Sequence, residues 1–423
     1  MLNIKFTKYK LGEILDVTRG ASLSGEFYAT EGEYIRLTCG NFDSQNNCFK
    51  ENKSKDNLYY IGEFKLEFLM KKGDIITPLT EQAIGLLGST AIIPESGKYI
   101  QSQDVAKIIC KEDLLDKDFA FYLISSALVK QQLSAAAQQT KIRHTSPDKI
   151  KDCTVWIPEL SEQKRIGKLL RSIDRKIELN RAINQNLEVM AKQLYDYWFV
   201  QFDFPNKNGK PYKSSSGEMV WNERLKREIP EGWNIKTISE IENNIITGKT
   251  PSCADEDNFG GNIPFITIDD IRGNLFVFKS QRTLSTKGAK LQAKKYLPIG
   301  SLLVSCIGTI GVMGFTATLS QTNQQINSIV FENEYNKEFV YFTLKMYFEK
   351  AKAKTGNVFA NMSKEEFSTI KVIYPPKHIL QIFHNKIVVI LDKIKNIANE
   401  MNNLTKQRNE LLPLLMNGQI TIE

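Results

Sequence analysis

The chain has 423 residues, which is enough for two or three domains that each bury a hydrophobic core. Its composition is ordinary for a globular protein, with 42% apolar and 25% charged residues. The formal net charge of +8 is too small for a dedicated DNA-condensing protein, so any nucleic-acid binding depends on local basic patches or on a partner that adds charge.

Targeting and membrane segments are not expected. The first residues, Met1–Lys10, are polar and lack the apolar core of a signal peptide. The uncharged stretch Tyr296–Phe331 is interrupted by Pro298 and by four glycines, so it predicts buried β-strands rather than a membrane span. The six cysteines form no C-x-x-C pair and there are only three histidines, which argues against a zinc site. We therefore expect a cytoplasmic protein with reduced thiols and no metal.

A segment of about 190 residues occurs twice, with the same landmarks in the same order, and a repeat this long is a duplicated domain rather than a solenoid unit. The landmarks of the first copy are Leu11–Ser24, Lys71–Thr80, Ser102–Cys110, Phe119–Gln139 and Val155–Pro158. Those of the second copy are Ile238–Ser252, Leu297–Gly311, Asn323–Phe331, Phe339–Lys354 and Val372–Pro376.

Each copy predicts a mixed α/β domain. Short apolar runs between Gly, Pro, Asn and Ser clusters predict strands. These runs are Asp74–Thr77, Ala91–Ile93 and Val105–Cys110, then Pro264–Ile268, Ser301–Ile307 and Ile326–Phe331. A helix is expected at Asp118–Gln139, with Asp118 as its N-cap. Another is expected at Asn336–Lys354, with Asn336 as its N-cap and Gly356 as its stop.

A long helix with a heptad repeat follows each domain, and four consecutive heptads favour a coiled coil. The first seam is Ile166, Leu170, Ile173, Ile177, Asn180, Asn184, Leu187, Ala191, Leu194 and Trp198. The second is Phe383, Ile387, Ile390, Ile394, Ile397, Met401, Leu404, Arg408, Leu411 and Leu415. Because the chain must return between the helices, the pair would be antiparallel and the molecule pseudo-two-fold symmetric. Two separate helices, each packed on its own domain, are the alternative.

The predicted fold class is therefore α/β (α+β), with two tandem domains joined by two long antiparallel coiled-coil helices. The predicted boundaries are 1–160 for the first domain, 161–200 for the central helix, 201–230 for a linker, 231–376 for the second domain and 377–423 for the C-terminal helix. The linker is rich in Lys, Ser, Gly and Pro, and Trp221 is expected to anchor it.

Several enzyme-like motifs are incomplete. Gly248–Lys249–Thr250 resembles the end of a phosphate-binding loop, but Asn243 stands where that loop needs a glycine. Asp148 followed by Glu162–Gln163–Lys164 matches a nuclease metal site only superficially, because Glu162 falls in the first turn of the long helix. The base-holding motif of adenine methyltransferases is also missing. We therefore expect a non-catalytic chain.

Polar, glycine-rich turns recur at matching places in both copies: Arg19 corresponds to Lys249, and Gln101–Gln103 to Asn323–Gln325. Arg and Lys pair with guanine edges, Asn and Gln with adenine edges, and backbone amides at such turns suit phosphates. Turns needed only by the fold, and solvated basic faces, are the alternative. The candidate DNA contacts are Arg19, Ser22, Arg36, Asn41, Gln101, Gln103, Lys141 and Arg143, then Thr247, Lys249, Thr250, Asp270, Arg272, Gln324, Gln325, Lys352 and Lys354.

The long helices also carry apolar residues outside their seams, more than a two-helix coil covers by itself. Either the domains or another protein must cover them. The candidate partner-binding residues are Leu169, Leu179, Val189, Tyr195, Phe199, Leu412 and Leu414.

Over nearly its whole length the chain resembles the specificity subunits of type I restriction–modification systems. The most specific runs are ITGKTPS at Ile246–Ser252, IPFITIDDIRGN at Ile263–Asn274, LLVSCIGTIGVMGF at Leu302–Phe315, the helix that begins PELSEQKRIG at Pro158, and ELLPLLMNGQITI at Glu410–Ile422. The first copy departs from the pattern, because GLLGSTAII at Gly85–Ile93 stands where a GTIG-like run is expected.

The resemblance implies two target-recognition domains that read a bipartite, asymmetric sequence in double-stranded DNA. It implies assembly with two methyltransferase subunits and, in the full complex, two ATP-dependent restriction subunits. S-adenosylmethionine, ATP and magnesium would then belong to those partners, and this chain would bind no cofactor. The alternatives are a stand-alone DNA-modifying enzyme and a protein-only coiled-coil scaffold.

Overall fold

The computed structural model describes residues 5–44, 46–52, 56–81, 85–136, 143–355 and 361–422. Its contacts divide the chain into two compact units. Unit 1 comprises Met1–Ile177 and Asn403–Glu423, and unit 2 comprises Glu178–Asn402. Each unit therefore contains one copy of the repeat and one part of each long helix.

Unit 1 is built on two small sheets. The first has the order β10-β8-β12-β2, and all of its pairs are antiparallel. The second has the order β11-β4-β7-β3, in which β11 runs parallel to β4. The strands are β2 (Leu15–Arg19), β3 (Tyr28–Ala29), β4 (Tyr34–Arg36), β7 (Tyr59–Tyr60), β8 (Ile75–Pro78), β10 (Ala91–Ile92), β11 (Tyr99–Ile100) and β12 (Val105–Cys110).

The helix expected at Asp118–Gln139 is two helices, α2 (Lys117–Ile124) and α3 (Ala127–Ala136), and the residues after Ala136 in that range lie outside the described part. The break falls at Ser125, whose hydroxyl donates to the carbonyl oxygens of Phe121 and Tyr122. The predicted N-cap was also wrong. Asp116, not Asp118, caps α2, because its carboxylate accepts from the Phe119 amide at 2.9 Å.

Unit 2 repeats the plan of unit 1 with a larger sheet of order β18-β25-β22-β23-β20 and a second sheet of order β21-β19-β24. The strands are β18 (Ile245–Thr247), β19 (Phe259–Ile266), β20 (Phe276–Val277), β21 (Arg282–Leu284), β22 (Leu302–Ser305), β23 (Met313–Thr316), β24 (Gln321–Thr322) and β25 (Ile326–Ile329). Every residue of β22 and β25 is buried, so the uncharged stretch forms core strands as predicted. No helix in the described part of the chain has the length and apolarity needed to cross a membrane.

Strand pairing shows how the two copies correspond. In each unit a strand leading from the first helix, β2 or β18, pairs antiparallel with a strand from the later part of the domain, β12 or β25. In each unit the second sheet contains one parallel pair, β4 with β11 and β19 with β24. In each domain the first and last strands also pair antiparallel. These pairs are β1 (Thr7–Lys10) with β14 (Thr154–Ile157) and β17 (Asn234–Thr237) with β26 (Lys371–Tyr374). The duplicated sequence therefore folds into a duplicated architecture.

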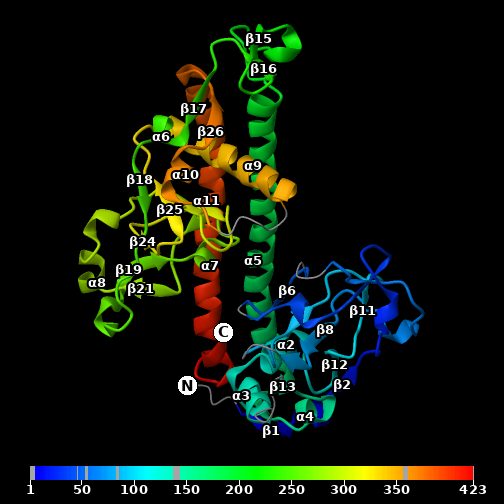
Figure 1. The fold of residues 1–423 in the computed structure, drawn as a ribbon. Helices are drawn as coiled ribbons and strands as arrows, with labels where there is room; N and C mark the ends of the chain where they lie inside the picture. The colour runs from blue at the N-terminus through cyan, green and yellow to red at the C-terminus, as the bar shows by residue number, and fades with distance from the viewer. Residues whose placement is uncertain are drawn as a thin grey trace. The chain divides into compact units, whose positions relative to one another are not determined.

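The two long helices are α5 (Leu160–Tyr195), which continues as a π-helical turn to Val200, and α11 (Lys377–Met416). Within unit 1, Arg165 donates to the carbonyl of Ile422 and Asp174 contacts Arg408. Within unit 2, the Asn184 amide donates to the carbonyl of Ile394 at 3.2 Å. The Asn180 side chain donates to Glu400 in the same unit. In both units residue numbers fall in the C-terminal segment as they rise on α5, so the predicted antiparallel pair is confirmed (Figure 1).

The seams of α5 and α11 are buried or half-buried throughout, as the heptads predicted. The expected linker anchor was wrong, however. Trp221, in the hairpin β15 (Met219–Asn222) and β16 (Arg227–Pro230), is 54% exposed. Phe202, Phe204 and Trp233 anchor the two ends of the linker instead, because all are buried in one aromatic cluster of unit 2.

Candidate nucleic-acid interface

In unit 1, two chain segments meet side by side just beyond the sheet. The segment after β2, from Arg19 to Ser22, lies against Gln101–Gln103, which precedes β12. The Ala21 amide donates to the carbonyl of Gln101 at 3.0 Å. A Cβ atom on Gly20 would lie 2.2 Å from the same oxygen, so only glycine allows this approach.

Unit 2 builds the same arrangement from Thr247–Thr250 and Thr322–Gln325. The Lys249 amide donates to the carbonyl of Thr322 at 3.0 Å. A Cβ atom on Gly248 would lie 2.1 Å from the carbonyl oxygen of Asn323. We call this arrangement the paired loops of each unit. Gly20 and Gly248 are structurally equivalent, because each allows the same close contact between backbones.

The paired loops present a small set of polar side chains to solvent. In unit 1, Arg19, Ser22 and Gln103 are exposed, and the Arg19 Nε donates to the carbonyl of Gln103 at 2.8 Å. In unit 2, Lys249 and Gln324 are exposed. The hydroxyl of Thr250 donates to Gln324 Oε1 at 2.6 Å, which leaves the amide nitrogen of Gln324 available to donate.

Two further candidates in unit 2 are half-buried and hydrogen-bonded to neighbouring side chains. The Thr247 hydroxyl donates to Asn327 Oδ1 at 2.6 Å, and the half-buried Gln325 accepts from the Asn323 side chain at 2.9 Å. Arg19 and Lys249 are also not equivalent positions, contrary to the correspondence expected from the sequence. Arg19 precedes the shared glycine and Lys249 follows it, so the two basic side chains leave the loops at different points.

Asn41 and Asp270 are buried and serve the fold. Each is the last residue of a capping box, in which it accepts from the amide of Thr38 or Thr267 at 2.9 and 2.8 Å. Asp270 also accepts from the Gln281 amide at 2.8 Å. These contacts engage the side-chain oxygens of both residues inside their own units.

Arg36 and Gln101 are buried as well. The Arg36 guanidinium lies 3.8 Å from the centre of the Tyr28 ring and donates to the carbonyl of Asn57 at 3.2 Å. The Gln101 amide donates to the carbonyls of Thr18 and Val105 at 2.8 and 3.0 Å. Both side chains make contacts inside the unit and neither is exposed in this structure.

The remaining basic candidates have mixed surroundings. Arg143 is half-buried and lies 3.4 Å from the buried carboxylate of Glu81, whereas Arg272 forms only an exposed ion pair with Asp269. Lys352 is exposed on α9 (Lys337–Thr355). Lys141 and the side chain of Lys354 lie outside the described residues.

The candidate partner-binding residues on the long helices fall into three groups by burial. Leu179 and Val189 are 60% and 55% exposed on unit 2. Leu169 and Leu412 pack against the core of unit 1, and Leu414 is half-buried. Tyr195 and Phe199 are buried in the aromatic core of unit 2, where their rings lie 5.2 Å apart, so they offer no surface to a partner.

Further exposed apolar residues lie on the same helices but were not among the candidates. They are Met190, Ile382 and Val389, with 53%, 39% and 67% exposure. Ile382 and Val389 are seven residues apart, so a second heptad stripe beside the α11 seam was the signal that could have identified them.

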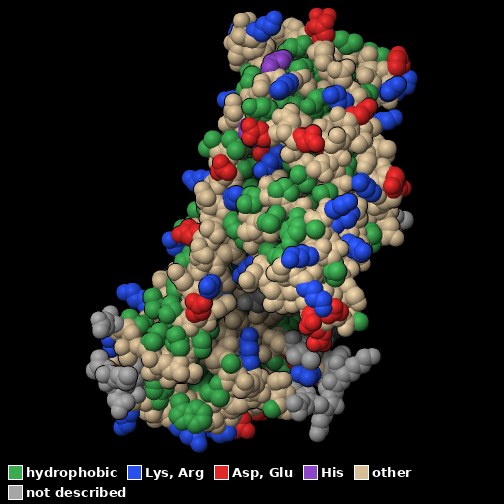
Figure 2. Space-filling model, turned by 90° about the vertical axis from the view of Figure 1, so that its left-hand side faces the viewer, with side chains coloured by type: hydrophobic (Ala, Val, Ile, Leu, Met, Phe, Trp, Pro, Cys, Tyr) green, Lys and Arg blue, Asp and Glu red, His purple; other side chains and the backbone are tan. Residues whose placement is uncertain are grey.

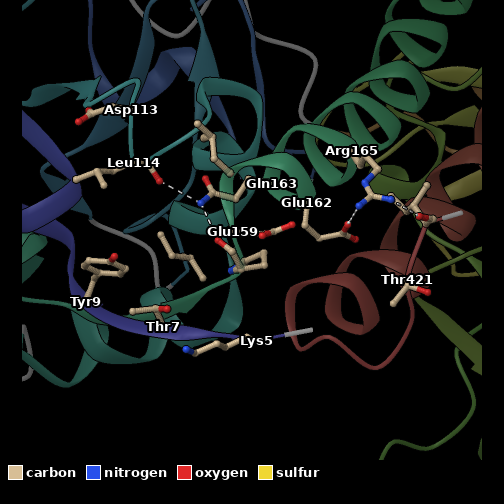
Figure 3. Close-up of a pocket in the computed structure, with 14 residues that line it drawn as sticks. Lys5, Thr7, Tyr9, Asp113, Leu114, Glu159, Glu162, Gln163, Arg165 and Thr421 are labelled. Carbon is tan, nitrogen blue, oxygen red and sulfur yellow. Dashed lines mark hydrogen bonds and ion pairs between the residues drawn. The ribbon is translucent and has the colours of Figure 1, made fainter. Parts of the chain in front are cut away.

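Unit 1 also contains a cavity of about 500 Å³ beside the first turn of α5, shown in Figure 3. Gln163 is tied there to the carbonyls of Leu114 and Pro158, while Glu162 pairs with Arg165 at 3.0 Å. The other Glu162 oxygen is buried without a hydrogen-bond partner among the described residues. The described residues contain no group of three His, Cys, Asp or Glu placed to hold a metal ion. The two hydrogen bonds of Gln163 connect the first turn of α5 to the segments at Leu114 and Pro158 beside this cavity.

Comparisons with known proteins point to one family. A family model described as the type I restriction modification DNA specificity domain matches residues 3–189 and 230–412. The HindI specificity subunit of Haemophilus influenzae, a type I restriction enzyme component, is 30% identical over 403 residues, covering 83% of this chain and 87% of that protein. The MjaIX specificity subunit of Methanocaldococcus jannaschii is 24% identical over 330 residues, covering 76% and 73%.

A solved structure has the same fold. The S subunit of a type I restriction–modification system from M. genitalium matches with a TM-score of 0.58 and 17% identity, over 98% of this chain and 97% of that one. The two ranges that the family model matches coincide with the two copies of the repeat and include most of α5 and α11.

Proposed function

This chain belongs to the family of type I restriction–modification DNA specificity subunits, and on that basis we propose that its two paired loops face the two halves of a bipartite, asymmetric DNA target. The observation that carries the proposal is the recurrence of one backbone arrangement, at Gly20 and Gly248, with different exposed side chains in each unit. A shared backbone frame with unlike side chains suits two domains that read different half-sites.

The exposed side chains have the chemistry for DNA contacts. Arg19 and Lys249 are exposed and positively charged, and each lies beside a glycine in the paired loops. A positively charged side chain at such a turn suits a phosphate or the edge of a guanine. Gln103 and Gln324 offer amides that suit base edges. Because Thr250 occupies Gln324 Oε1, this amide would act chiefly as a donor, for example to purine N7.

The surplus apolar surface of the long helices supports a docking site for partner subunits. We place the methyltransferase contact at Leu179 and Val189, and add Met190 and Val389, because all four are more than half exposed on the long helices. The complex would contain two methyltransferase subunits and, for restriction, two motor-nuclease subunits. S-adenosylmethionine, ATP and magnesium would be held by those partners in the cytoplasm, and this chain would supply recognition rather than catalysis.

The test begins with the target. Methylated adenines are mapped in a host that carries this chain and its methyltransferase partner, and a duplex with the mapped sequence is prepared. Binding is then measured for the chain alone and for its complex with the methyltransferase. We expect selective binding by the complex and methylation only when both proteins are present.

Two outcomes would contradict the proposal. Methylation by the purified chain with S-adenosylmethionine alone would identify a stand-alone modifying enzyme. A stable complex that binds mapped and scrambled duplexes equally would identify a protein-only scaffold. Where Arg19 or Lys249 contacts a base edge, its replacement by Ala should change base preference in one half-site only, which assigns that unit to that half.

A further inference from the structure

Charge is distributed unequally between the two domains. In unit 2, residues 271–331 contain seven Lys or Arg and no Asp or Glu. The corresponding stretch of unit 1, residues 42–110, contains eight Lys and nine Asp or Glu. The capping residues Asn41 and Asp270 and the paired strands β12 and β25 set this correspondence. One recognition domain therefore carries a strongly basic surface segment that the other lacks.

The basic residues of this segment are concentrated on α8 (Thr286–Lys290) and the short helix η7 (Ala293–Lys295). Lys290 and Lys294 are exposed, and no ion pair to a described carboxylate is formed by either. Lys287 differs, because its ammonium lies 2.9 Å from Asp255 and 3.3 Å from Asp257. Figure 2 shows the side of the molecule on which α8 lies in Figure 1, and Lys and Arg side chains are gathered on it. The charge of Lys290 and Lys294 is thus available to an external anion.

The α8 helix is held by the segment that follows the Lys249 loop. The Ser285 amide donates to the carbonyl of Asn258 at 3.0 Å, and a Cβ atom on Gly288 would lie 2.1 Å from the same oxygen. Asn258 in turn donates to the carbonyl of Ser252 at 3.1 Å, just beyond Thr250. The position of α8 therefore follows the position of this loop.

A second clamp ties α8 to the other loop of the pair. The buried Gln321 donates to the carbonyls of Ala289 and Gln292 at 3.1 and 3.2 Å, and its Oε1 accepts from the Gln292 side chain at 2.7 Å. Gln321 directly precedes Thr322–Gln325. The segment that carries the lysines of α8 and η7 is consequently held against both segments of the paired loops in unit 2.

Unit 1 has no helix at this place. Between β7 and the short helix η3 (Leu66–Phe68) the chain has only Ile61–Lys65, whereas Ser285–Gln292, including α8, lies between β21 and η7. The pairings of β7 with β4 and of β21 with β19 make the two connections equivalent. The basic helix is therefore an addition specific to the second recognition domain.

We propose that Lys290 and Lys294 form a phosphate-binding surface that holds the backbone of double-stranded DNA beside the paired loops of unit 2, with no helical counterpart among the described residues of unit 1. This inference rests on the proposed function. Lysines that neutralise phosphates add affinity without sequence preference and make binding depend on salt. On this proposal, Lys290 and Lys294 add salt-dependent binding at the second half-site.

The experiment uses the complex of the full chain with its methyltransferase and a duplex that carries the mapped target. Affinity is measured across a range of salt concentrations for wild type and for Lys290→Ala/Lys294→Ala. Loss of two phosphate contacts should lower the slope of log affinity against log salt by about two, because each contact contributes about 0.9. The order of preference among single-base substitutions of the target should not change.

A matched control removes the same charge elsewhere in unit 2. Lys207→Ala/Lys210→Ala takes two exposed lysines from the linker and should leave the slope unchanged. An equal fall in the slope for both double variants would overturn the inference, because net charge alone would then explain it. A wild-type slope in the α8 variant, or a change in base preference, would also overturn it.

Failure of the inference is distinguishable from failure of the proposed function. If wild-type complex does not bind the mapped duplex selectively, the proposed function fails. If wild type is selective and the α8 variant keeps the wild-type slope but captures less methyltransferase in a pull-down, the surface contacts protein and the phosphate assignment is wrong. Thermal unfolding of each variant within error of wild type confirms that the comparison is between folded proteins.

Discussion

Arg408 of α11 donates to Asp174 of α5 across 2.8 Å in the interior of unit 1, where the two residues are only 5% and 6% exposed. Arg408 occupies a seam position of its heptad, where an apolar residue is expected. Asp174 also accepts from the hydroxyl of Tyr122 in α2, so the ion pair joins both long helices to the recognition domain. Burial and the neighbouring carboxylate raise the pKa of Tyr122, which keeps it a hydrogen-bond donor.

The first prediction concerns this pair. Asp174→Asn leaves a buried guanidinium unpaired and Arg408→Met leaves a buried carboxylate, so each should destabilise unit 1 by about 3–5 kcal/mol. Asp174→Asn/Arg408→Met removes both charges and keeps an acceptor for Tyr122, so it should lie within about 1 kcal/mol of wild type. The free energy of unfolding in urea is measured for wild type, both single variants and the double variant. Additive losses in the double variant would show that the two charges are not coupled.

The second prediction concerns pH. His384 Nδ1 lies 2.7 Å from the buried Glu338, and this hydrogen bond raises the pKa of His384 above its ordinary value of 6.5, while desolvation opposes the shift. Glu334 adds to the rise, and Lys337 opposes it. A raised histidine pKa stabilises the fold fully below 6.5 and less as pH rises through the folded value.

His384→Gln removes this pH-dependent stabilisation. The free-energy difference between wild type and the variant should therefore shrink as the solution is taken from about pH 6 to about pH 8, measured by denaturant unfolding. A difference that grows over that range would have the wrong sign for a raised pKa. Glu334→Gln serves as a control, since it should change the size of the effect only slightly.

The third prediction concerns Lys249, which is exposed beside Gly248. If it contacts phosphate, Lys249→Ala should weaken binding to all sequences alike and lower the salt slope by about one. If it contacts a guanine edge, the loss should be about 1–3 kcal/mol at one position of the target. Titrations across salt and base substitutions distinguish the two. No effect in either series would mean that the turn serves the fold alone.

The fourth prediction concerns partner docking on the long helices. Leu179→Glu places a charge on a 60% exposed apolar residue, so it should weaken methyltransferase binding by about tenfold or more with little change in thermal stability. Gln185→Glu adds the same charge at an exposed polar position of α5 and is the matched control. Capture of wild-type amounts of methyltransferase by folded Leu179→Glu would exclude this surface.

The fifth prediction concerns the spacer between half-sites. Duplicating Ile177–Ile183 in α5 and Ile397–Asn403 in α11 adds one heptad to each helix and keeps both seams in register. The helices lengthen by about 10 Å, which is about three base pairs at 3.4 Å each. Methylation mapping should show a longer spacer with the same half-sites. An active variant with the original spacer would show that the helices do not set the distance.

The sequence alone determined the duplicated plan and the antiparallel helices. Heptad spacing is a local property, because residues three and four apart lie on one face of a helix whatever surrounds it. Antiparallel pairing followed from connectivity, since the chain has to return to begin the second helix. The sequence also indicated the glycine-rich turns at Gly20 and Gly248, but the second loop that lies against each of them came only from the structure.

Only the tertiary structure decided which polar residues face solvent. Arg36, Asn41, Gln101 and Asp270 looked like surface contacts in the sequence, yet each is buried and hydrogen-bonded to a partner inside its own unit. Some partners are distant, as Thr18 is from Gln101. Sequence patterns indicate where a polar residue stands in an element, but its hydrogen-bond partners depend on how the elements pack.

Packing between distant segments also decided which residues of the long helices are covered and where the basic helix α8 is held. Tyr195 and Leu179 both lie off the α5 seam, but only Tyr195 meets the aromatic core of unit 2, where it stacks on Phe342 at 5.4 Å. The run of lysines from Lys287 to Lys295 was present in the sequence. The sequence does not show that α8 is held next to both paired loops. Asn258 and Gln321 hold α8 through hydrogen bonds between residues that are about 30 positions apart in the chain, and such contacts depend on the tertiary structure.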